Sequence, residues 1–226
     1  MSLLIVAVIG YLIGTISFTR LIGRFALPGE DLSETEYQIP QSDETWTYHG
    51  VSASSVVERV GWKWGLAVVV LDGLKGLVPT LVLLVAFPDS PAYAVGAAAV
   101  IVGHVWPVWW RFEGGRGQSV LIGALIAIDV LSLPVAILVG AALGIMVFTS
   151  VYMARNMWPL PLIAWFWWSD GISANFWFAV VANVVYWTAS RSDIEEALRV
   201  RRFRGISAMS YPARLRHAWR AFFSED

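Results

Sequence analysis

Residues 103–117 read Gly-His-Val-Trp-Pro-Val-Trp-Trp-Arg-Phe-Glu-Gly-Gly-Arg-Gly and join two long apolar runs, the second of which begins at Val120. A charged, glycine-rich turn between two apolar segments is typical of a point where a membrane meets water. The three glycines allow positive φ angles and a close approach of the backbone. Their N–H groups can form a concavity for an anion, and Arg116 can add a forked cation. The stretch predicts either a phosphate-binding loop at the membrane surface or a tight polar connection between helices.

The composition indicates an integral membrane protein. Of the 226 residues, 57% are hydrophobic and only 15% are charged, whereas a soluble domain carries about 25% charged residues. We therefore expect an all-α fold, a polytopic membrane helix bundle. The chain has no cysteine and only three widely separated histidines, so disulfides and thiolate chemistry are excluded, and neither a metal site nor a cofactor is expected.

Seven apolar segments predict about seven transmembrane helices, at residues 3–19, 62–87, 92–111, 118–133, 134–154, 157–169 and 172–190. Lysine and arginine gather on one side of these segments, and the connections on the other side contain none. By the positive-inside rule the N-terminus lies outside and the C-terminus in the cytoplasm. We expect a membrane domain at 1–190, with a cytoplasmic loop at 26–61, and a basic cytoplasmic tail at 191–226.

The cytoplasmic loop changes character along its length. Its first part, within residues 29–45, is acidic and typical of a solvated loop, whose role the sequence leaves open. Its second part is rich in small and hydroxyl residues, among them Ser52 and Ser55. This second part predicts either a phosphate-contacting turn or the N-cap of the next helix.

One charge pair falls inside an expected span. Asp72 and Lys75 are three residues apart, so they share a helix face and can pair. Charges inside a membrane are costly and usually face the interior of the bundle. A structural ion pair and a catalytic role are both open, and we favour the structural one because the pair neutralises itself.

The tail is rich in arginine, and residues 212–223 predict an amphipathic helix. Its apolar face would contain Leu215, Ala218, Trp219 and Phe222. Such a helix is typical of attachment to anionic membrane lipid. Because a membrane surface already lies next to the tail, no nucleic-acid partner is expected.

From about Gly10 to Asp193 the chain resembles the bacterial acyl-phosphate:glycerol-3-phosphate acyltransferases, the PlsY family. The glycine-rich stretch is similar to the family's second motif at Gly103, His104, Pro107, Phe112, Gly114, Gly115 and Gly117. The segment from Leu71 to Gly76 resembles the family's second helix. The first helix is also similar and contains Gly10 and Gly14, a pair at which a neighbouring helix can pack closely. The resemblance implies a seven-span bundle with three motifs at its cytoplasmic face.

The chain departs from the family pattern in each motif. The family's first motif reads Ser-Gly-Asn-x-Gly-x-x-Asn-x-x-Arg. At the positions of its Ser, first Asn, second Gly, second Asn and Arg, this chain has Tyr48, Gly50, Ser52, Ser55 and Glu58. In the second motif, Glu113 and Arg116 replace two lysines. In the third, usually His-Arg-x-Asn-Ile-x-Arg-Leu, only Arg191 and Ile194 match.

The resemblance implies acyl transfer from a fatty acyl phosphate to the 1-hydroxyl of glycerol-3-phosphate, at the cytoplasmic face of the cell membrane. The catalytic candidates are Arg116, His104, Ser52 and Ser55. The candidates for holding the two phosphate groups are Gly114, Gly115, Gly117, Arg59, Arg191 and Asp193. For His104 the resemblance favours capping or orienting the loop over a general-base role. Because phosphate is a good leaving group, direct transfer needs no covalent intermediate, and most of the catalysis can come from positioning and charge stabilisation.

Three functions remain open from the sequence. The first is an active acyltransferase, which the run of matching motifs favours. The second is a family member that has lost the activity or uses another acceptor, which the altered first and third motifs favour. The third is a small transporter or scaffold, although the sequence shows no inverted repeat of the kind that transporters carry.

Overall fold

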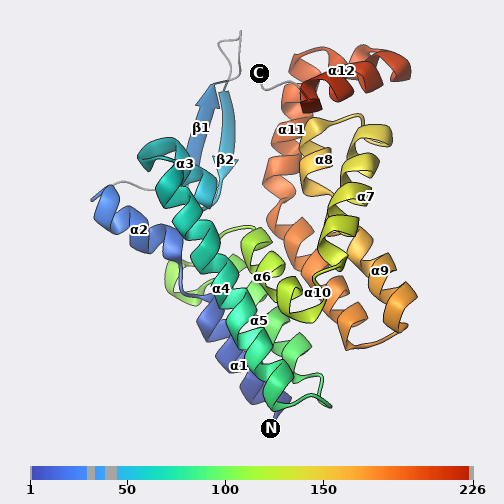
Figure 1. Cartoon of the computed structure of the whole chain (residues 1–226). Helices are drawn as coiled ribbons and strands as arrows, with labels where there is room; N and C mark the ends of the chain where they lie inside the picture. The colour runs from blue at the N-terminus through green and yellow to red at the C-terminus, as the bar shows by residue number, and fades with distance from the viewer. Residues whose placement is uncertain (1, 30–33, 39–44, 224–226) are drawn as a thin grey trace. The chain divides into compact units, whose positions relative to one another are not determined.

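The computed structural model describes residues 2–29, 34–38 and 45–223. The chain forms two compact units, one made of Met1–Val130 with Val184–Ser192 and the other of Leu131–Asn183 with Asp193–Asp226. Figure 1 shows that most of the described chain is helical. Among the described residues, three helical segments are long and apolar enough to cross a membrane: Leu3–Ala26, Trp62–Ala86 and Ala92–Trp110.

Within the described residues, the part of the first unit before Val130 is made of helices and one hairpin. The helices are α1 (Leu3–Gly14), α2 (Phe18–Ala26), α3 (Ala53–Val60), α4 (Trp62–Ala86), α5 (Ala92–Val105), the 3-10 turn η1 (Val108–Trp110) and α6 (Gln118–Ile128). The hairpin pairs β1 (Glu34–Gln38) with β2 (Thr45–His49) in antiparallel register. The described chain is thus mostly helical, as expected, and this two-stranded hairpin interrupts the helices in the polar segment at 26–61.

Close helix contacts in the first unit depend on small residues. α1 packs on α5, where a Cβ atom added to Gly10 would lie 2.7 Å from the carbonyl oxygen of Gly96. An added Cβ on Gly14 or Gly103 would likewise collide with the backbone of the other helix. The paired glycines of the first helix therefore pack inside the bundle, in the way that membrane helices use small residues.

The first expected span lies within the candidate span Leu3–Ala26, but it is broken at Thr15, Ile16 and Ser17. α1 ends at Gly14 and α2 begins at Phe18, so residues 3–19 are not one continuous helix. The break exposes two backbone carbonyl groups, and the Lys75 amino group donates to both, at 3.2 Å from Gly14 O and 2.7 Å from Ile16 O. A broken helix is tolerated in a membrane when protein groups satisfy the freed carbonyls.

The second unit contains α7 (Ser132–Met146), α8 (Val151–Asn156), α9 (Pro161–Asp170), the 3-10 turn η2 (Ile206–Ala208) and α12 (Tyr211–Phe223). The helix α10 (Ala174–Ala189) runs from this unit into the first, and α11 (Arg191–Phe203) runs back. The expected span at 134–154 is wrong, because α7 ends at Met146 and Thr149 adopts a left-handed φ of 48°. Arg201 donates to the carbonyl of Phe148 and to the Thr149 hydroxyl, which fixes this break.

The tail contains the helix α12 where the sequence predicts an amphipathic one, and protein covers much of its apolar face. Ala218 packs with Ile145 and Ala154 of α7 and α8, and Leu215 and Phe222 pack against the same cluster. Trp219 remains 56% exposed. The expectation that all four apolar residues face lipid is thus wrong for three of them, because α7 and α8 offer an apolar surface of their own.

Candidate functional site

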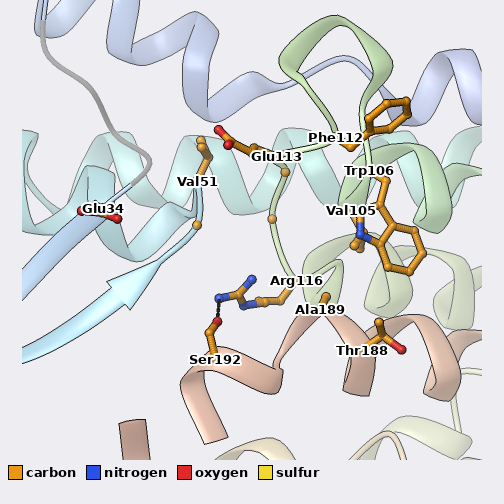
Figure 2. Close-up of a pocket in the computed structure, with 13 residues that line it drawn as sticks. Glu34, Val51, Val105, Trp106, Phe112, Glu113, Arg116, Thr188, Ala189 and Ser192 are labelled. Atoms are coloured by element: carbon orange, nitrogen blue, oxygen red, sulfur yellow. Dashed lines mark hydrogen bonds between the residues drawn. The ribbon is translucent and has the colours of Figure 1, made fainter. Parts of the chain in front are cut away.

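A pocket of about 420 Å³ opens in the first unit beside the glycine-rich loop. Its walls come from the end of the hairpin, the turn after β2, the end of α5, the glycine loop and the turn between α10 and α11. The side chains that Figure 2 labels around it are Glu34, Val51, Val105, Trp106, Phe112, Glu113, Arg116, Thr188, Ala189 and Ser192. Segments far apart in sequence thus meet at one cavity.

The glycine loop folds against the end of α5 and the turn after β2. The Gly115 N–H group donates to the His104 carbonyl at 3.3 Å, and the Val51 N–H group donates to the Gly114 carbonyl at 3.4 Å. A Cβ on Gly114 would collide with the His104 carbonyl, and one on Gly115 would lie 3.0 Å from the Val51 carbonyl oxygen. Both positions need glycine for close backbone approach.

Of the three loop glycines for which the sequence allowed positive φ angles, Gly117 has one, and two non-glycine residues have one as well. Arg111 and Phe112, just before the glycines, have φ values of 53° and 62°, and Gly117 has 80°. Gly114 and Gly115 are not in the positive-φ region. Left-handed conformations at two non-glycine residues are uncommon and are held here by the surrounding contacts.

Arg116 of the second motif contacts one residue at a position of the first motif and one at a position of the third. Its guanidinium lies over Gly50, where an added Cβ would be 3.3 Å from the nearest guanidinium nitrogen. The same side chain donates to the Ser192 hydroxyl at 3.3 Å, as Figure 2 shows. Because Gly50 has no side chain, the planar guanidinium can lie against the backbone and still line the pocket.

His104 supports the loop from behind the pocket and does not line it. Its Nδ1 atom lies 2.8 Å from the Lys75 amino group, which in turn pairs with Asp72 at 2.9 Å. Because an ammonium group only donates, Nδ1 accepts and the imidazole proton is assigned to Nε2. Lys75 of α4 therefore holds the His104 ring. The backbone carbonyl of His104 accepts the hydrogen bond from Gly115. This geometry supports the loop-orienting role.

Ser52 and Ser55 lie outside the pocket lining. Ser52 caps α3 by accepting from the Ser55 N–H group at 3.2 Å, and the two hydroxyl groups are 3.2 Å apart. Ser55 is completely buried. The structure therefore shows the N-cap that the sequence left open.

The remaining candidates are not among the residues that line the pocket. Arg59 donates to the Glu34 carbonyl and braces the hairpin. Gly117 precedes α6, Arg191 is exposed, and Asp193 is buried in the second unit. Of the predicted site residues, the pocket brings together Gly114, Gly115 and Arg116.

The sequence missed several residues of the pocket. Glu34 lies in the acidic stretch that resembled a solvated loop, and Glu113 was noted only as a departure from the family pattern. Ser192 follows Arg191 by one residue, and that proximity is the one signal that could have singled it out. The lining therefore combines one arginine with two carboxylates. Within residues 2–29, 34–38 and 45–223, no cluster of three or more histidine or carboxylate side chains could hold a metal ion.

The comparisons with known proteins agree with one another. The sequence model for glycerol-3-phosphate acyltransferase matches residues 4–200. A protein of that name from Myxococcus xanthus is 34% identical over 142 residues, 62% of this chain and 65% of the relative. One from Legionella pneumophila strain Corby is 30% identical over 157 residues, 69% of this chain and 48% of the relative. The chain thus spans less than two thirds of the length of these curated relatives.

Solved structures are similar over nearly the whole chain. The crystal structure of PlsY, an integral membrane glycerol 3-phosphate acyltransferase, in its glycerol 3-phosphate form has a TM-score of 0.69 at 26% identity. The lysophosphatidic acid form has a TM-score of 0.70 at 25% identity. Each match covers 89% of this chain and 94% of the solved one.

Proposed function

This chain belongs to the glycerol-3-phosphate acyltransferase family, and on that basis we propose that it transfers a fatty acyl group from acyl phosphate to the 1-hydroxyl of glycerol-3-phosphate. The products are lysophosphatidic acid and inorganic phosphate. The observation that carries the proposal is the position of Arg116, which lines a pocket together with the glycines of the second motif.

The proposed reaction needs no covalent enzyme intermediate. The 1-hydroxyl oxygen forms a bond to the acyl carbonyl carbon, and the bond from that carbon to the phosphate oxygen breaks. The hydroxyl proton leaves with the released inorganic phosphate. Arg116 would hold a phosphate group and stabilise the charge that develops as it departs. Ser192 holds the guanidinium in place, and the packing of Gly114 and Gly115 fixes the loop, so the site supplies positioning before substrate arrives.

We further propose how the chain lies in the membrane. Residues 1–190 would form a domain of about seven spans, with the N-terminus outside and the C-terminus in the cytoplasm. The charge distribution supports this orientation, because basic residues concentrate on one side of the apolar segments. The pocket would then open at the cytoplasmic face of the cell membrane, and the arginines of the tail would attract anionic lipid. The proposed reaction uses no metal or cofactor.

A matched pair of variants tests the function. Purified protein in lipid is supplied with palmitoyl phosphate and radiolabelled glycerol-3-phosphate, and lysophosphatidic acid is measured. Arg116→Gln should lower kcat/KM at least about 100-fold, the usual cost of losing one donor to developing charge. Arg111→Gln removes the same charge from the same loop but outside the pocket lining, and should stay within about twofold of wild type.

Two results would overturn the proposal. One is the absence of product from folded wild-type protein when a known family enzyme works in parallel with the same acyl donor. The other is an equal effect of the two substitutions, because the pocket would then have no special part in the reaction.

A further inference from the structure

A second pocket of the first unit shares no lining residue with the one described above. Its volume is about 510 Å³, and it lies where α1 breaks into α2, against η1. Two of the candidate membrane spans, Leu3–Ala26 and Ala92–Trp110, contain all of its lining residues. The pocket is therefore situated towards one end of membrane-spanning helices.

The floor of this pocket is apolar and open. Leu12, Ile16 and Leu21 line it, and each leaves between 45% and 50% of its surface exposed. In a membrane-spanning segment, exposed aliphatic side chains face lipid tails. Trp109 adds a large ring that is 68% exposed and donates from Nε1 to the Thr15 hydroxyl at 3.0 Å. Tryptophan at such a position is typical of the level of lipid headgroups.

The rim of the pocket is positively charged. Arg20 and Arg24 both line it and are one helical turn apart on α2. None of the described residues that line it has a carboxylate. The Arg20 guanidinium lies 4.9 Å from the centre of the Trp110 ring and donates to the Glu113 carbonyl at 3.0 Å. These contacts hold one cation at the rim, and Arg24 is exposed beside it.

An apolar floor beneath two arginines is complementary to one chemical class, an amphiphile with a phosphate headgroup. We propose that this pocket binds an anionic phospholipid of the surrounding bilayer, with its phosphate between Arg20 and Arg24 and an acyl chain along the floor. Guanidinium groups match phosphate oxygens in a forked geometry. This binding does not depend on the proposed catalytic function, because the two pockets share no lining residue.

Lipid binding is measured by native mass spectrometry of the purified full chain, titrated with dioleoyl phosphatidylglycerol or dioleoyl phosphatidylcholine. Each arginine near a membrane surface contributes about a fivefold gain in affinity for anionic lipid. Arg24→Gln should therefore weaken phosphatidylglycerol binding about fivefold, and Arg20→Gln/Arg24→Gln about 25-fold. The control Lys63→Gln/Arg111→Gln removes the same charge from the same unit outside the pocket, and should change binding less than twofold.

The single Arg24 variant keeps the test valid if the loss of Arg20 disturbs the fold, since Arg24 is exposed. Three outcomes would each overturn the proposal. The control could lose as much binding as the double variant, which would indicate unspecific charge attraction. Phosphatidylcholine could bind as tightly as phosphatidylglycerol, which would indicate an apolar groove alone. Palmitoyl phosphate could displace the lipid in simple competition, which would assign the pocket to the acyl donor.

Discussion

Replacing Lys75 with methionine should destabilise the protein by about 3–5 kcal/mol, the cost of leaving one partner of a buried ion pair without its counter-charge. Asp72 and Lys75 are only 4% and 7% exposed, and their charged atoms are 2.9 Å apart. Methionine has a similar length and fills irregular space well, so the loss of packing adds little. The Asp72 carboxylate would then be left buried with no cation beside it.

The same amino group also closes the break in the first helix. It lies 2.7 Å from the Ile16 carbonyl oxygen and 2.8 Å from His104 Nδ1. A carbonyl group that loses its donor in the membrane interior adds to the cost. The expected loss therefore lies at the upper end of the range, and the glycine loop behind His104 should lose part of its support.

Thermal unfolding in detergent micelles measures the effect. At about 2–4 °C per kcal/mol for a chain of this size, the Tm of Lys75→Met should fall by about 10–20 °C. The double variant Asp72→Asn/Lys75→Met removes both charges and should recover much of the loss. An unchanged Tm in the single variant would refute the buried pair. A double variant with a wild-type Tm and no acyl transfer would show that the pair serves the chemistry and not the fold.

Three further substitutions, one of them with a matched control, test other contacts. Gly115→Ala places a Cβ 3.0 Å from the Val51 carbonyl oxygen. It should lower acyl transfer at least tenfold and the free energy of unfolding by about 1–3 kcal/mol. The control is Gly73→Ala, whose Cβ meets nothing closer than 3.7 Å, and it should raise the Tm. Burial raises the pKa of the Tyr37 phenol, so stability should fall as the pH rises above about 10, where the unfolded phenol ionises first. Tyr37→Phe should abolish that fall in alkaline unfolding curves. Glu113→Lys replaces a negative charge in the pocket and should lower the KM for glycerol-3-phosphate about tenfold, an effect that 1 M salt should remove.

The part of the site that follows from local backbone geometry was predictable from the sequence. Gly114 and Gly115 predicted a close backbone approach, which the structure shows, whereas the anion site at Arg116 stays a prediction. Both expectations depend on neighbouring residues alone. Ser52 was open between two roles because an N-cap and a phosphate-binding hydroxyl have the same sequence signature, and only the direction of the side chain separates them.

Glu34 could not be predicted from neighbouring residues, because it reaches the pocket only through the register of the hairpin. It pairs with His49 across the two strands, so it lies beside the turn that begins at Gly50. The acidic residues around it resembled a solvated loop, and a register is not specified by charge alone. The helix breaks after Gly14 and Met146 were missed for a different reason. Hydropathy averages over many residues, so the few hydroxyl residues at each break leave the segment apolar, whereas the break itself depends on distant donors such as Lys75 and Arg201.

Two departures from the family pattern explain each other in the structure. The family pattern has asparagine where this chain has Gly50, and lysine where it has Arg116. Arg116 extends across Gly50 so closely that an added Cβ would lie 3.3 to 3.5 Å from three guanidinium atoms. Gly50 also has a φ of 147°, which a side chain rarely adopts. The Arg116 guanidinium therefore lies against position 50, where any side chain would make a tight contact with it. The altered first motif is thus compatible with a working pocket, since its position still shapes the surface on which the cation lies.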